Sequence, residues 1–176
     1  LSNIQNEDER LARNYRKILK LSAFLIFPLM LILSAVADPL IRVLLSDKWE
    51  GCIILLQILC FSLMWYPIHA INLNLLIVKG RSDLFFRLEV FKKIIGVSIM
   101  VVTIPHGIIW MVSGGIVSSM ISLIINTYYT GKLINVGYLK QMGDLLPIFG
   151  VSFAVWIIVH GSMMMSSNIY VQLIIG

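Results

Sequence analysis

Three charged residues lie close together in an otherwise apolar stretch of the chain. Glu89, Lys92 and Lys93 fall between Leu88 and Ile94, and at roughly 100° per residue they share one helical face. Residues 94–104 alone cross only about half of a bilayer, so a spanning helix must begin near residue 82 and carry these charges inward. Ionisable side chains at that depth usually face a bundle interior or a wet cavity. The pattern predicts a cavity in which the two lysines hold positive charge for an anion.

A second interpretation of the same residues stays open. Lys92 and Lys93 could extend to the inner headgroups, with Glu89 paired to Lys93 one turn away. Arg87 falls on another side of the helix, four residues after Asp83, a spacing that is typical of a surface ion pair.

The apolar segment before this one carries a polar stripe. Ser62, Trp65, His69 and Asn72 follow one another at i, i+3, i+7 and i+10, which is one helical face. The stripe could line a cavity. Alternatively, each polar side chain could bond a neighbouring helix, an interaction worth ~0.6 kcal/mol, while Trp65 packs.

Composition fixes the setting of these residues. Of 176 residues, 59% are hydrophobic and 13% are charged, whereas soluble domains carry roughly 25% charged residues. A soluble enzyme, a nucleic-acid binder and a disordered tail are therefore excluded. The sequence holds no Walker, HExxH or paired-Cys motif, so we expect no cofactor, no metal and no enzymatic chemistry.

The apolar runs predict an all-α fold, a polytopic transmembrane helix bundle. Residues 1–20 are expected to form a cytoplasmic juxtamembrane segment, and residues 21–176 the membrane part. Asp38 is expected to cap a short helix that starts at Pro39, and Pro67 to kink the second span. We expect the sequence to be a fragment, with its last run truncated. The segments are about 21–45, 52–78, 82–104, 108–127, 145–160 and 168–176.

The basic residues predict how the bundle sits in the membrane. Twelve of the 14 Lys and Arg residues fall on one side when successive spans alternate, and only Arg42 and Lys48 fall on the other. The positive-inside rule places the larger group in the cytoplasm. Gly114, Ser118 and Ser122 repeat every four residues, a spacing that favours close helix packing over ligand binding.

Several linked stretches carry a family resemblance. They are residues 66–74, 79–85 and 88–94, together with Glu9 to Leu11, Phe27 to Met30 and the run from Asp38 through Trp49. The chain resembles the bacterial polysaccharide (O-antigen or exopolysaccharide) flippases of the MOP exporter superfamily. Ser46-Asp47 departs from the family, which usually has a Gly there. The resemblance implies a two-lobed bundle of about 12 to 14 helices, with this chain in the second lobe and the lobes exchanging access in turn.

The resemblance also implies a function. Such proteins are thought to move undecaprenyl-pyrophosphate-linked oligosaccharides across the bacterial inner membrane. A pyrophosphate would suit a cationic cavity, which makes Lys92 and Lys93 the first candidates, beside Glu89, with Arg87, His69 and Asn72 behind them. The implied partners are the lipid-linked oligosaccharide, the bilayer and other polysaccharide-assembly proteins, and no nucleic acid.

Two other functions remain open at this point. A related drug or ion-coupled exporter would need a carboxylate deep in a span, and Glu89 is already matched by adjacent lysines. A membrane-embedded polysaccharide polymerase or ligase would need a large outer loop, whereas the expected outer gaps, such as residues 46–51, are short.

Overall fold

Every element in the described part of the chain is a helix, which confirms the predicted all-α class. The computed structural model describes residues 2–164, and the expected segment 168–176 lies outside them. The helices are α1 (Ser2–Ala35), α2 (Ala37–Leu45), α3 (Gly51–Leu63), α4 (Tyr66–Val78), α5 (Ser82–Thr103), α6 (Ile108–Ile134) and α7 (Tyr138–Met164), with 3-10 turns at Asp47–Trp49 and Ile104–His106.

Four helical stretches in the described residues are long and apolar enough to cross a membrane. They are Glu9–Ala35, Gly51–Val78, Ile108–Ile134 and Tyr138–Met163. The 22 residues of α5 measure about 33 Å, close to the thickness of the hydrocarbon. Nevertheless α5 is not one of these four stretches, because it carries charges at Arg87, Glu89, Lys92 and Lys93. That α5 crosses the bilayer stays a prediction.

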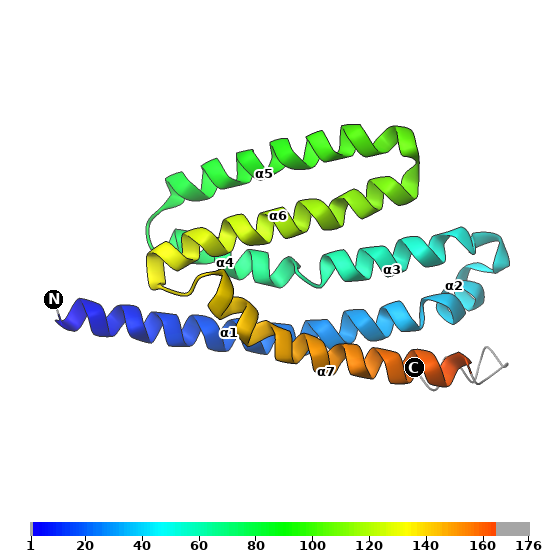
Figure 1. Ribbon diagram of the computed structural model, residues 1–176, viewed down its shortest axis with the longest axis horizontal. Coiled ribbons are helices and arrows are strands. Elements are labelled where there is room, and N and C mark those ends of the chain that lie inside the picture. Colours follow the sequence, from blue (N-terminus) through cyan, green and yellow to red (C-terminus); the bar gives the residue numbers. More distant parts are fainter. Residues whose placement is uncertain (1, 165–176) are drawn as a thin grey trace.

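The helices run back and forth, and their connections gather at two ends. Figure 1 shows the start of α1, the α4–α5 turn and the α6–α7 turn at one end, and α2 with the α5–α6 turn at the other. The first end carries the basic segments of the sequence. The successive helices therefore alternate in direction, as the assignment of the basic residues to one side requires.

The apolar core lies between α1, the α3–α4 pair and α7. Leu19, Phe27, Met64, Ile68 and Leu145 are completely buried. Trp65 belongs to this core, because its ring lies 5.2 Å from that of Phe27 and 6.3 Å from that of Phe149, centroid to centroid. Of the alternatives for Trp65, the packing one is confirmed.

The second predicted span is broken rather than only kinked. The helix α3 ends at Leu63, and α4 begins at Tyr66 with Pro67 in its first turn. A proline is tolerated there because the first N–H groups of a helix have no partner within it.

Several boundaries differ from the sequence-based expectations. The segment before residue 21 continues into α1 without interruption, and Tyr15 and Leu19 within it are buried. The last two described helices are longer than expected, since α6 continues to Ile134 and α7 begins at Tyr138. Polar residues in these extensions have partners on other helices, which a count of apolar residues cannot detect.

The short helix α2 begins at Ala37, two residues before the expected start at Pro39. Asp38 is its second residue and makes no capping hydrogen bond, because the helix starts at Ala37. Its carboxylate instead accepts a hydrogen bond of 2.8 Å from Nε of Arg42. Arg42 also binds Asp47 at 3.0 Å and Glu50 at 2.9 Å, so this one cation joins α2 to the following turn.

Candidate functional site

A groove of about 720 Å³ lies between α4, α5 and α6. It collects four of the residues that the sequence singled out: His69 from α4 and Glu89, Lys92 and Lys93 from α5. From α6 it receives Ser118, Ser119 and Ser122. The expected shared face of Glu89, Lys92 and Lys93 is thus confirmed, and His69 lies opposite it.

The two lysines differ in their surroundings. Nζ of Lys92 pairs with the carboxylate of Glu89 one turn earlier, and the Lys92 side chain is only 11% exposed. Lys93 is exposed, and no ion pair to it occurs within the described residues. Lys92, and not Lys93, is therefore the partner of Glu89, and the pair leaves Lys93 as the uncompensated cation of the groove.

His69 joins α4 to α6 across the floor of the groove. Its Nε2 lies 2.9 Å from Oγ of Ser119, while its buried Nδ1 has no hydrogen-bond partner in the described residues. A buried ring nitrogen without a partner is costly unless water or a ligand reaches it. His69 therefore bonds the neighbouring helix, as one alternative proposed, and it also lines the groove.

The small residues of α6 serve two purposes. A methyl group added at Gly114 would lie 2.9 Å from Cγ2 of Ile99, so Gly114 permits close contact between α5 and α6, as predicted. Ser118 lies near Gly96 of α5, yet Ser118 and Ser122 also line the groove. Packing by this repeat is confirmed at Gly114, and the absence of ligand binding at its serines stays a prediction.

Asn72 lies in a buried polar cluster with residues of α6 and α7. It is buried, and its Oδ1 accepts hydrogen bonds from Thr130 at 2.6 Å and from Gln141 at 3.1 Å. Its Nδ2 donates to Oε1 of Gln141 at 3.0 Å. The structure places Asn72 outside the groove, where it joins α4, α6 and α7, so the polar stripe does not line one cavity.

Arg87 lies away from the groove too. It lines a separate pocket of about 520 Å³ with Phe91 of α5 and Tyr128 of α6. The expected Asp83–Arg87 pair does not form, because Asp83 instead accepts hydrogen bonds from Arg81 at 3.2 and 3.4 Å. Arg81 ends the turn before α5 and is closer to the helix start than Arg87.

Sequence reasoning missed one buried charge. Asp144 of α7 has a side chain that is 6% exposed; Arg16 binds it through Nε at 2.6 Å and Nη2 at 2.7 Å, and Lys20 binds it at 2.9 Å. The sequence does show this charge, because Asp144 directly precedes the apolar segment 145–160. Its partners could not be identified from sequence, as they lie more than 120 residues away.

The groove offers cations and hydroxyl groups. Within residues 2–164, no three His, Cys, Asp or Glu side chains lie close enough to hold a metal ion. Lys93, the Lys92–Glu89 pair and the serines can bind an anion. Leu73, Val97 and Met100 supply apolar wall beside them.

Comparison with known proteins places the chain in a biological context. Residues 1–54 match the family described as polysaccharide biosynthesis protein. Over this stretch the chain is similar to polysaccharide biosynthesis proteins. It is 26% identical to the lipopolysaccharide biosynthesis protein WzxC of Escherichia coli (strain K12) over 169 residues, which cover 91% of this chain and 34% of that protein.

A second similar protein comes from a different bacterium. The chain is 26% identical over 133 residues to an uncharacterized membrane protein in the cps region of Klebsiella pneumoniae, covering 75% of this chain and 27% of that protein. The chain thus spans about a third of the length of these relatives. No solved structure matches it. It is a multi-pass membrane protein, and the predicted family resemblance is confirmed.

Proposed function

We propose that this protein takes part in moving an undecaprenyl-pyrophosphate-linked oligosaccharide across the bacterial inner membrane by alternating access. The observation that carries the proposal is the groove, where Lys92 and Lys93 of α5 face His69 of α4. The relative named for lipopolysaccharide biosynthesis favours a polysaccharide precursor over a drug as the cargo.

In this proposal the groove binds the pyrophosphate. Lys93 supplies the charge, because Lys92 is already balanced by Glu89. Hydroxyl donors come from Ser118, Ser119 and Ser122 along α6. Hydrogen bonds to an ionised phosphate are stronger than those between two neutral groups. The wall formed by Leu73, Val97 and Met100 would lie against the start of the polyprenyl chain. Transport of this kind requires binding and release but no bond making, so we assign no catalytic residue.

Access would alternate as helices on either side of the groove rock against each other. The broken α3–α4 segment is the bending point that we assign, because the helical hydrogen-bond pattern is interrupted between Leu63 and Tyr66. Parts of the full-length protein beyond this chain would complete the cavity. Other polysaccharide-assembly proteins would deliver and receive the cargo.

The proposal is tested by removing the two cations together. Lys92→Gln with Lys93→Gln in the full-length protein should abolish surface polysaccharide while the amount of protein in the membrane stays unchanged. Arg87→Gln is the matched control, since it removes a cation from the same helix outside the groove. Surface polysaccharide would be quantified by gel and by antibody binding.

Two results would contradict the proposal. Normal polysaccharide export by the double variant would leave the lysines with a headgroup role only. Loss of drug resistance with intact polysaccharide export would assign the groove to a drug exporter instead.

A further inference from the structure

A second cationic site lies at the basic end of the bundle, away from the groove. A hollow of about 320 Å³ on α1 is lined by Arg13, Arg16, Lys17 and Lys20, all cations. Two carboxylates approach them: Asp144 binds Arg16 and Lys20, and Glu9 lies 3.6 Å from Arg13. Two carboxylates against four cations leave a net positive charge, and Lys17 makes no ion pair with any described residue.

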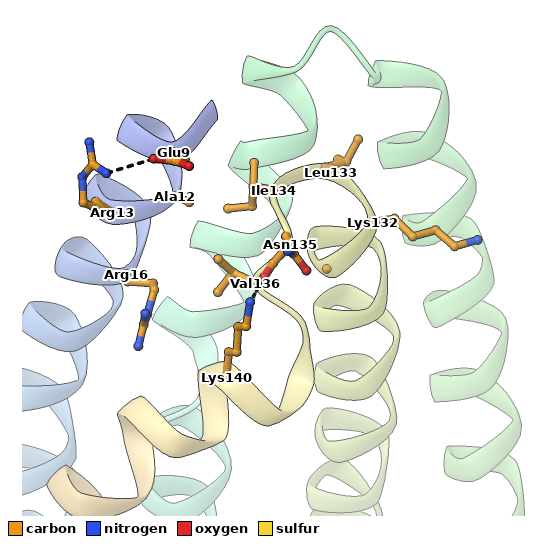
Figure 2. Close-up of a pocket in the computed structure, with 11 residues that line it drawn as sticks. Glu9, Ala12, Arg13, Arg16, Lys132, Leu133, Ile134, Asn135, Val136 and Lys140 are labelled. Atoms are coloured by element: carbon orange, nitrogen blue, oxygen red, sulfur yellow. Dashed lines mark hydrogen bonds and ion pairs between the residues drawn. The ribbon is translucent and has the colours of Figure 1, made fainter. Parts of the chain in front are cut away.

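The hollow is held in place by the fold. Asp144 of α7 fixes the head groups of Arg16 and Lys20 at 2.6 to 2.9 Å. Arg13 and Arg16 also border a larger adjoining pocket of about 630 Å³ at the α6–α7 turn. Figure 2 shows Lys140 at the rim of that pocket, where its Nζ donates to the carbonyl of Asn135 in the α6–α7 turn at 2.8 Å. Two of the four cations in the hollow, Arg16 and Lys20, are therefore held by a second helix.

The surface that continues from the hollow is apolar. Arg13, Lys17, Leu21 and Leu25 follow one another at intervals of four residues, so they lie along one face of α1. Leu21 is 59% exposed and Leu25 is 61% exposed, with Phe24 beside them. One helix face thus changes from cationic to exposed and apolar within about two turns, a pattern that matches a molecule with an anionic head and a hydrocarbon tail.

We propose that this hollow binds the phosphate headgroup of an anionic phospholipid, whose acyl chain lies along Leu21, Phe24 and Leu25. The apolar continuation favours a lipid over free phosphate, which would gain nothing from it. Clusters of Lys and Arg next to a membrane-spanning helix attract anionic lipids. The site is separate from the groove, because the two share no lining residue.

The test is native mass spectrometry of the full-length protein released from detergent with added lipid. Phosphatidylglycerol should remain bound, while phosphatidylcholine, which has the same phosphate but no net charge, should be retained far less. Equal retention of the two lipids by the unaltered protein would overturn the proposal without any variant being needed.

A matched pair of variants locates the binding site. Lys17→Gln should weaken retention of phosphatidylglycerol by about fivefold, and Lys17→Gln with Arg13→Gln should weaken it further. Lys48→Gln removes an exposed cation from the opposite end of the bundle and should change nothing. Unchanged retention in the double variant would overturn the proposal, and so would displacement of the lipid by millimolar inorganic phosphate, which would indicate a simple anion site.

Discussion

At the scale of single residues, the charged side chains of the membrane helices differ in burial and in pairing. Lys93 is exposed in the groove without an ion pair among the described residues, whereas Asp144 is buried under two cations. A buried carboxylate is tolerated only when it is well paired. Asp144 therefore joins α1 to α7, whereas the binding of a ligand by Lys93 is a proposal.

The structural role of Asp144 predicts a loss of stability on its removal. Asp144→Asn leaves Arg16 and Lys20 facing a neutral group and should lower the free energy of unfolding by about 1.5 to 3 kcal/mol. Glu9→Gln is the control, because the Glu9–Arg13 pair is largely exposed and its loss should cost no more than about 0.5 kcal/mol. Thermal unfolding in detergent measures both, and equal midpoints would contradict the role of Asp144.

Residue types that stand out from an apolar background could be found from sequence. Helical periodicity placed Glu89, Lys92 and Lys93 on one face, and the structure brings them together. The same reasoning failed for Asn72, because periodicity gives the direction of a side chain relative to its own helix and not which neighbour it meets. The side-chain partners of Asn72 are Thr130 and Gln141, which are 58 and 69 residues away.

At the scale of helices, the contact between α5 and α6 sets the width of the groove. At Gly114 an added methyl group would lie 2.9 Å from Ile99 and 3.1 Å from Thr103, while at Gly115 the nearest atom would be 3.9 Å away. The first distance is too short for two carbon atoms, so the helices would have to move apart.

This difference predicts opposite behaviour of two neighbouring variants. Gly114→Ala should lower the free energy of unfolding by roughly 1 to 3 kcal/mol. The thermal midpoint and the yield of folded protein should fall with it. Gly115→Ala should leave both unchanged or slightly raised, since alanine favours a helix. Fluorescence-detected size exclusion after heating compares them, and similar loss in both variants would mean that Gly114 does not define the contact.

Helix existence was easier to predict than helix ends. Apolar runs located every long helix of the described chain, but α7 begins seven residues earlier than expected, at Tyr138. Gln141 and Asp144 read as polar and therefore as loop, although both are buried with partners on other helices. Tertiary pairing, which sequence hydropathy does not contain, decides such ends.

At the scale of the whole molecule, charge distribution and chain path agree. The basic segments near Lys17, Lys79 and Lys132 converge on one end, and Lys48 lies at the other. Alternation of spans was enough to predict this grouping. The side-by-side placement of α1 and α7, seen in Figure 1, could not be predicted, because both helices are simply apolar in sequence.

Labelling of single cysteines in intact cells tests whether the basic end of the bundle faces the cytoplasm. The proposed roles of Lys92 and Lys93 and of the lipid site both depend on this orientation. With Cys52 and Cys60 replaced by alanine, Lys48→Cys and Arg81→Cys would each be exposed to a maleimide that cannot cross the inner membrane. We expect Lys48→Cys to react from outside and Arg81→Cys to react only after the membrane is opened. Labelling of Arg81→Cys in intact cells, with Lys48→Cys protected, would contradict this orientation.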